Sequence, residues 1–146
     1  MNYKRSWILA ILIIAALLLS ACGQRLAAAE KIQPAVVESV EKSEFNRVKL
    51  TERAAERLGI QTARVLEEPV NGEQRLVLPY AAILYGLNGE TWVYTNGEPL
   101  TYVRAAITVD YIDDDRVVLS DGPPAGTHVV TVGVAQLFGA ETGVGK

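Results

Sequence analysis

The chain offers few side chains that could act together as a nucleophile and a base. Its single histidine is His128, and the serines beyond the N-terminal apolar segment are Ser39, Ser43 and Ser120. Covalent catalysis needs a nucleophile, a base within hydrogen-bond reach and a group that orients the base. His128 stands in a segment with the composition of a strand, which favours an ordinary strand residue. No phosphate loop, zinc-ligand spacing or dinucleotide fingerprint occurs, so we expect no enzyme activity and no cofactor.

A cluster of aspartates raises the question of a metal site. Asp113, Asp114 and Asp115 are consecutive, with Asp110 and Asp121 nearby. Calcium takes several carboxylate oxygens, but this cluster lacks the alternating spacing and terminal glutamate of an EF-hand loop. Three successive aspartates are typical of a solvated hairpin turn. No methionine follows the N-terminal apolar segment, so a soft thioether site has no ligands, and we expect no metal.

Cys22 is the one cysteine of the chain, and its position gives it a chemical role. Two basic residues precede an uncharged apolar run from Trp7 to Leu19, which is the pattern of a secretory signal. A transmembrane helix over 7–21 is the alternative, but this run is shorter than the roughly 20 residues that cross a bilayer. The end of the run, Leu19-Ser20-Ala21-Cys22, resembles the lipobox of bacterial lipoproteins, in which the cysteine sulfur receives diacylglycerol. The resemblance implies a signal peptide over 1–21, a membrane-lipid anchor at Cys22 and an extracytoplasmic, periplasmic-side location.

The charge balance excludes one class of partner. The chain has 14 basic and 17 acidic side chains, and loss of the signal would remove two of the basic ones. Nucleic-acid binding depends on basic side chains that neutralise phosphates, so we expect no nucleic-acid partner. The chain beyond Cys22 is long enough for one modest core, which predicts one domain.

The first part beyond the anchor has no sustained apolar period. Residues 22–44 mix charges, alanines and Pro34, which predicts a lipidated cysteine followed by a flexible tether. An edge strand over 34–40 is the alternative. From Phe45 to Leu50, apolar and basic side chains alternate as in a half-buried strand.

A short helix is predicted over 52–58. Thr51 can cap it through its side-chain oxygen, and Gly59 can end it in the left-handed conformation. Its charged residues lie at helical-neighbour spacings that predict opposite-charge pairs and a solvated face, with a partner surface as the alternative. These residues are Glu52, Arg53, Glu56 and Arg57.

The rest of the chain is typical of short strands between turns. Residues 67–75 are expected to be a turn-rich connection, and Pro79 predicts an edge strand or a break. Beyond Gly133 we expect one helical turn. Strands are predicted over 60–65, 76–85, 91–94, 100–112, 116–120 and 127–132, with turns at 88–89, 96–97, 113–115 and 121–126. The pattern predicts a mainly-β sandwich or barrel with one short α-helix over 45–142, followed by a tail over 143–146.

Two long stretches of this predicted domain carry a resemblance. The first is RVKLTERAAERLGIQTARV over 47–65. The second contains LVLPYAAILY (76–85), TWVY (91–94), YVR (102–104), VVLSDG (117–122), AG (125–126), VVTVG (129–133) and QLFGAE (136–141). In order and spacing these pieces resemble the periplasmic adaptor subunits, or membrane fusion proteins, of resistance-nodulation-division (RND) efflux pumps.

The resemblance implies a small β-rich membrane-proximal domain that docks onto the transporter. The middle of the family's chains, which supplies a second barrel, a lipoyl-like domain and a helical hairpin, is missing here, and 67–75 joins the two halves. The implied function is a non-catalytic, lipid-anchored accessory protein that docks onto an RND-type transporter and modulates efflux. The competing interpretation is a cell-envelope β-module that binds a ligand or protein and is unrelated to efflux. Gly23 provides no obvious inner-membrane retention signal, so both membranes stay open.

Overall fold

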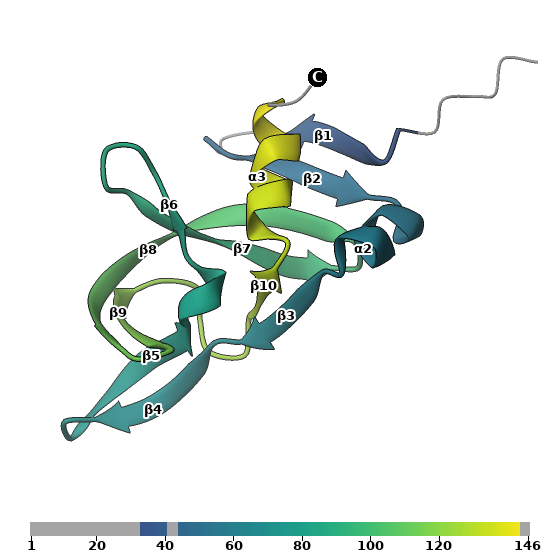
Figure 1. The fold of residues 1–146 in the computed structure, drawn as a ribbon. Coiled ribbons are helices and arrows are strands. Elements are labelled where there is room, and N and C mark those ends of the chain that lie inside the picture. The colour runs from purple at the N-terminus through teal and green to yellow at the C-terminus, as the bar shows by residue number, and fades with distance from the viewer. Residues whose placement is uncertain (1–32, 41–43, 144–146) are drawn as a thin grey trace, which may run out of the picture. The chain divides into compact units, whose positions relative to one another are not determined.

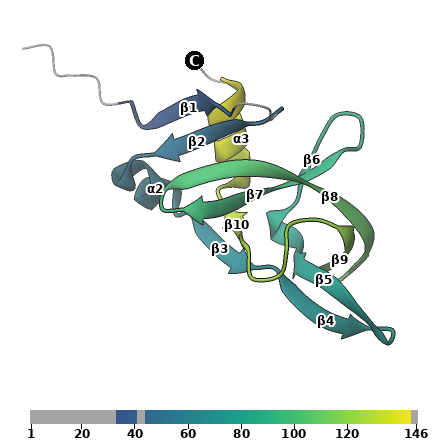
Figure 2. The ribbon, with the colours of Figure 1, turned by 180° about the vertical axis from the view of Figure 1, so that it is seen from behind.

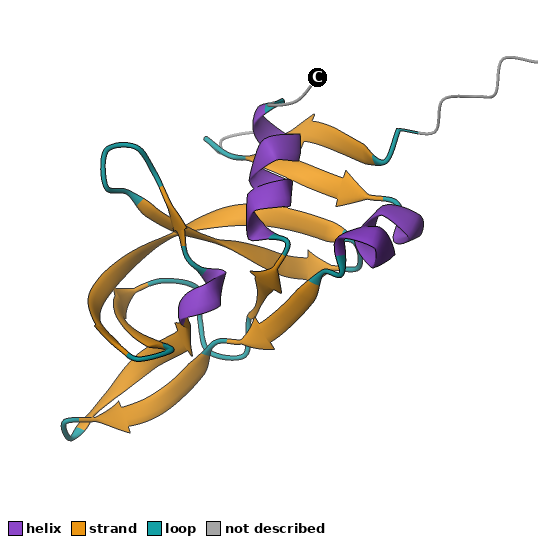
Figure 3. Cartoon of the chain, viewed as in Figure 1, coloured by secondary structure: helices purple, strands orange, loops and turns teal. Residues whose placement is uncertain are grey.

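The computed structural model describes residues 33–40 and 44–143. The predicted signal, Cys22 and the first part of the predicted tether lie outside the described residues. Strands dominate the described part, as Figure 3 shows, and the mainly-β prediction is confirmed. None of the helices within these ranges has the length and apolar character needed to cross a membrane.

A curled antiparallel sheet forms the centre of the fold (Figure 1). Its strand order is β3-β10-β7-β8-β9-β5-β4. The first and last strands of this path are consecutive in the chain and are separated by Val65 alone, so the sheet curls until its two ends meet there. Val65 donates from its amide to Thr127 O at 2.9 Å and accepts from Gly126 N at 2.8 Å. These strands span β3 Gln61–Arg64, β4 Leu66–Val70, β5 Glu73–Pro79, β7 Thr91–Glu98, β8 Thr101–Asp113, β9 Arg116–Asp121 and β10 His128–Val132.

The space within the curl is filled by aliphatic side chains. Period-2 alternation places one face of each strand inward, and burial of these faces supplies the apolar driving force for folding. Between β5 and β7 the chain passes through a 3₁₀ turn, η2 Tyr80–Ala82, and the short strand β6 Leu84–Tyr85. The buried residues of this first core are Val65, Leu78, Ala82, Val93, Ile107, Val117, Leu119 and Val129.

A second core lies beside the curl and involves both α-helices of the described residues (Figure 2). Strand β1 Ala35–Ser39 pairs with β2 Asn46–Leu50, which in turn pairs with β8. The helices are α2 Glu52–Leu58 and α3 Val134–Thr142, and α3 packs against β2 and β1. The buried members of this second core are Val48, Leu50, Ala55, Tyr94, Tyr102, Val130 and Leu137.

The short helix has the ends that its capping residues predict. Thr51 Oγ1 accepts from Ala54 N at 3.2 Å, and Gly59 adopts φ 60°. The predicted helix over 52–58 is therefore confirmed at both ends. The strand break at Pro79 and the turn at Asn88-Gly89 are confirmed as well, since β5 ends at Pro79 and β6 pairs with β7.

The tether prediction is wrong for Ala35–Ser39, which form β1, so the alternative of an edge strand holds there. The strand pairs antiparallel with β2, from Ala35 opposite Leu50 to Ser39 opposite Asn46. Val36 and Val37 are exposed on β1, so its sequence has no clear buried face to reveal it. These residues form a strand because they pair with β2. The β domain therefore begins at β1, earlier than the predicted residue 45.

Three other expectations are corrected. The connection over 67–75 is a β4–β5 hairpin, with Asn71 and Gly72 at φ 53° and 88° in its two-residue turn. Asn96 and Gly97 lie inside β7 at a register irregularity. The chain turns after β7, in the two residues before β8, where Leu100 has φ 58°. The C-terminal segment forms the nine-residue helix α3 instead of one turn, which gives a second helix.

Strict alternation along β8 would bury every second residue from Thr101 to Tyr111, and this pattern holds only in part. Thr101 and Ile107 are buried as expected, whereas Tyr111 is 39% exposed and Tyr102 on the opposite parity is buried. Two causes are visible. The second core covers the other side of the first half of β8, and irregularities between Thr108 and Tyr111 shift the pleat.

Candidate functional site

A buried ion pair joins α3 to the sheet. Glu141 on α3 accepts from Arg104 Nε at 2.8 Å and from its second guanidinium nitrogen at 3.0 Å. The Glu141 side chain is 1% exposed and that of Arg104 is 12% exposed. Tyr94 OH donates to Glu141 at 2.5 Å, and Asn46 N donates at 3.2 Å. The carboxylate thus connects α3 with β2, β7 and β8.

Aromatic rings surround the guanidinium of this pair. The Arg104 guanidinium carbon lies 4.6 Å from the Phe45 ring centroid, 4.9 Å from that of Trp92 and 5.4 Å from that of Phe138. Burial, and then the hydrogen bond to Glu141, raise the pKa of Tyr94 far above its ordinary value, so its hydroxyl stays a neutral donor. The polar groups of this cluster bind one another. Through Glu141 and Arg104 the cluster holds α3 and Trp92 in place.

An open hollow of about 680 Å³ lies beside Trp92, between the start of β7 and the middle of β8. Its wall combines aromatic, aliphatic and acidic residues. Gly86 is required for this packing, because a Cβ there would lie 2.6 Å from Trp92 Cη2 and 2.4 Å from Glu90 Oε2. The hollow is lined by Glu44, Phe45, Gly89, Glu90, Thr91, Trp92, Ala106, Ile107, Thr108 and Val109.

One carboxylate on the rim of this hollow is held in place by a turn. Asn88 donates to Glu90 from its amide and from its side chain, both at 3.1 Å. These bonds, the side-chain bond foremost, lower the pKa of Glu90. Glu90 therefore carries a fixed negative charge beside Trp92.

A second hollow, of about 430 Å³, lies where β4 and β5 meet the β8–β9 turn. Its wall includes Leu66, Val77 and Leu78, and its rim includes the ion pair between Arg116 and Glu68. Arg64 and Asp115 also line this hollow, but apolar atoms provide most of its surface.

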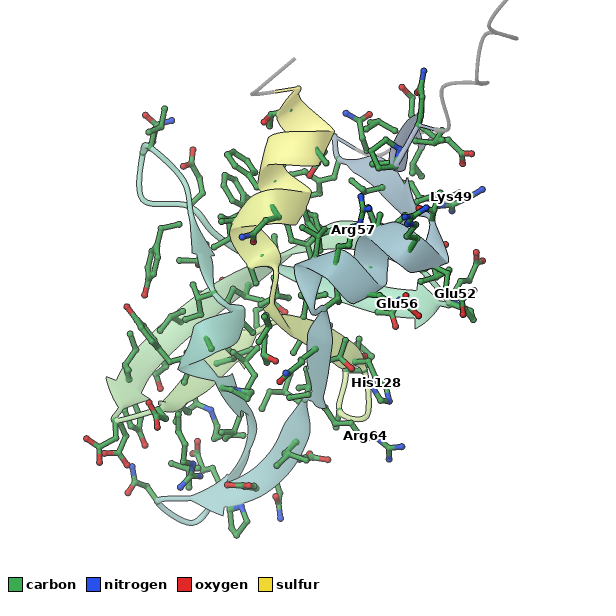
Figure 4. The ribbon with its side chains drawn as sticks, turned by 45° about the vertical axis from the view of Figure 1, so that its right-hand side comes forward. Lys49, Glu52, Glu56, Arg57, Arg64 and His128 are labelled. Atoms are coloured by element: carbon green, nitrogen blue, oxygen red, sulfur yellow. The ribbon has the colours of Figure 1, made fainter. Side chains whose placement is uncertain are left out.

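In the part of the chain that the structure describes, His128 is not assembled with Ser120 into a catalytic group. His128 lies in β10, as predicted, and is labelled in Figure 4. Thr62 Oγ1 lies 3.4 Å from its Nδ1. Arg64 Nε donates to His128 Nε2 at 3.3 Å, so this nitrogen acts as an acceptor. Ser120 instead donates to Thr108 O at 3.3 Å. Ser43 lies outside the described residues.

The aspartate triplet forms the predicted turn. Asp113 ends β8, and Asp114 has φ 51° in the two-residue connection to β9. Asp110 is bound by Arg75 at 2.6 Å. Over residues 33–40 and 44–143, His, Cys, Asp and Glu side chains do not gather in threes that could hold a metal ion.

The predicted charge pairs on α2 do not form. The ion pairs found in the described ranges leave out its four charged residues, and Figure 4 shows Glu52 and Glu56 away from Arg57. All four charged residues of α2 are exposed, so this face of the helix is solvated. The pair of Lys49 with Glu38, at 3.1 Å, joins β2 to β1 and does not involve α2.

Exposed apolar side chains lie on the β6–β7 hairpin and on the preceding 3₁₀ turn η2, and the sequence did not reveal them. Leu87 is fully exposed, Tyr85 is 51% exposed and Tyr80 is 44% exposed. The rings of Tyr80 and Tyr85 lie 6.5 Å apart. We call these three residues the hairpin tip. Leu87 lies in the turn between β6 and β7. A turn has no periodic pattern of apolar residues that could predict which side chains are exposed.

Comparison with protein-family models, with curated proteins and with solved structures finds no match for this chain. The class of protein is therefore defined by its fold: a small, mainly-β domain with a curled sheet, a second core under two helices, and an exposed hairpin tip.

Proposed function

We propose that this protein is a non-catalytic, lipid-anchored accessory protein of an RND-type efflux transporter, which it contacts through the hairpin tip. Cys22 carries the lipid and holds the β domain at the extracytoplasmic face of the membrane. The protein modulates transport and does not bridge to an outer-membrane channel.

The exposed hairpin tip is the observation that carries this proposal. Burying a leucine or a similar side chain contributes about 1.5–3 kcal/mol, so the fully exposed Leu87 and the partly exposed Tyr85 and Tyr80 leave apolar surface for a partner to cover. Apolar patches of this kind mark interaction sites on soluble domains. Tyrosine is also among the residues enriched in protein interfaces.

The pairing of the two resembling stretches gives further support. Strand β2 from the first stretch pairs with β8 from the second, and β3 pairs with β10. A two-residue turn at Asn71 and Gly72 replaces the segment that carries the additional domains in the resembling family. A shortened chain can thus retain a transporter-facing unit with its strands in place.

The alternative is a cell-envelope β-module that binds a ligand or protein and has no transporter. The open hollow at Trp92 favours this alternative, because it offers a concave surface of the size that small molecules occupy.

Replacing Cys22 by serine is expected to move the protein from the membrane to the soluble extracytoplasmic fraction. Serine keeps the size of the side chain but cannot receive the thioether-linked diacylglycerol. The measurement is membrane fractionation together with incorporation of labelled palmitate, with Ser20→Ala as a control that keeps a small residue in the signal. A labelled, membrane-bound Cys22→Ser protein would contradict the anchor.

Replacing Leu87 by aspartate is expected to reduce co-purification with a transporter encoded beside this protein at least ten-fold, which corresponds to about 1.4 kcal/mol. The charge would place a hydrated carboxylate in an apolar contact. Leu66→Asp is the matched control, since Leu66 is another leucine with high exposure, 48%, and lies on β4 instead of the hairpin. Equal losses for both variants, or retention by Leu87→Asp, would contradict the hairpin tip as the contact.

A further inference from the structure

We propose that the hollow beside Trp92 binds an alkylammonium group, that is, an organic cation that carries an apolar tail. The residues that carry this proposal are Trp92 and Phe45 on the aromatic wall, Ile107 and Val109 on β8, and the carboxylates Glu44 and Glu90 on the rim. The site is independent of transporter docking.

The size of the hollow and its apolar wall fit such a ligand. Its volume of about 680 Å³ lies within the roughly 300–1,000 Å³ of small-molecule sites. The edge-to-face contact of Phe45 and Trp92, with ring centroids 6.1 Å apart, sets two aromatic surfaces at an angle of 73°. An ammonium group is attracted to the negative face of such rings, most strongly to that of tryptophan.

The charges around the hollow select a cation. Glu44 and Glu90 are acidic, and the described residues that line the hollow include no basic side chain. Glu90 is held by two hydrogen bonds from Asn88, so its charge is positioned before a ligand arrives. An anion of the same size would meet two negative charges, whereas a cation gains attraction from both.

Two contacts hold Trp92 for this purpose. Gly86 allows the indole to approach the backbone more closely than any side chain would permit, as the 2.6 Å distance from an ideal Cβ shows. Arg104 lies over both rings, 4.6 Å from the centroid of Phe45 and 4.9 Å from that of Trp92, yet its guanidinium is paired with the buried Glu141. Because that positive charge is compensated, it leaves the carboxylates on the rim available to a ligand.

The test uses fluorescence of the full chain with Trp7→Phe, which leaves Trp92 as the one tryptophan. The protein, in a neutral detergent, is titrated with hexyltrimethylammonium chloride and separately with sodium hexanesulfonate, which has the same tail and the opposite charge. We expect a saturable change of Trp92 emission with the ammonium compound alone. Glu90→Gln is expected to weaken binding roughly three-fold, the effect of one exposed charge pair, and Glu67→Gln, away from the hollow, to leave it unchanged.

An equal response to the sulfonate, the absence of a saturable response, or equal weakening by Glu67→Gln would overturn the proposal. Dihexanoylphosphatidylcholine, a short-chain lipid that is soluble as a monomer, offers the same trimethylammonium group on a headgroup. Tighter, Glu90-dependent binding of this lipid would assign the natural ligand to a lipid headgroup. Tighter binding of hexyltrimethylammonium would assign it to a soluble amphiphile, and either result supports the site.

Discussion

Replacement of Glu141 by alanine is expected to lower the free energy of unfolding by about 3 kcal/mol. The substitution leaves Arg104, whose side chain is 12% exposed, without its ionic partner. It also leaves the buried hydroxyl of Tyr94 and the amide of Asn46 without their acceptor. Breaking one side of a buried pair costs more than the pair contributes, because the uncompensated charge stays in a poorly solvated place.

Urea unfolding of the full chain, followed by far-ultraviolet circular dichroism, measures this loss. The matched control is Glu67→Ala, which removes an exposed glutamate outside every ion pair of the described residues and should change the free energy of unfolding by less than about 0.5 kcal/mol. An equally small effect of Glu141→Ala would show that the buried network does not hold α3 to the sheet.

A double variant separates the loss of the pair from the penalty of the orphaned charge. Arg104→Met with Glu141→Leu replaces both charges by apolar side chains of similar length. We expect the double variant to be more stable than Glu141→Ala, because it leaves no buried charge. A double variant as unstable as the single one would assign the effect to lost packing around Phe45 and Trp92 instead.

Replacement of Leu137 by alanine is expected to lower the free energy of unfolding by about 3 kcal/mol. Leu137 has no exposed surface, and it lies in the second core together with Val48, Tyr94 and Val130. Truncation removes buried methyl groups and leaves a cavity, which neighbouring strands held by hydrogen bonds can close only partly. The same urea titration measures the loss.

Leu87→Ala is the matched control for this second prediction. It makes the same chemical change at a leucine that is fully exposed, so the free energy of unfolding should change by less than about 0.5 kcal/mol. Similar losses at both positions would contradict the assignment of Leu137 to the core. Leu137 and Glu141 both lie on α3. The two predictions therefore test whether the packing of this helix contributes to the free energy of unfolding of the domain.

Local chemistry predicted much of the fold. Thr51 and Gly59 set both ends of α2 because a cap and a left-handed terminus are local geometries. Pro79 ended a strand because it cannot donate to the sheet, and the alternation of apolar residues placed most strands correctly. The partners of single polar residues were not predicted: His128 contacts Thr62 and Arg64, and Ser120 donates to Thr108 O.

Only the tertiary structure decided the features that carry the proposals. Strand β1 depends on hydrogen bonds from β2, and α3 depends on Glu141 reaching Arg104, 37 residues earlier in the chain. The hollow at Trp92 is lined by Phe45 and Ile107, which lie far apart in the chain. Sequence by itself determined local elements, and it predicts Cys22 as the anchor. Contacts between distant residues decided the sites, because burial and charge pairing exist only after the chain has folded.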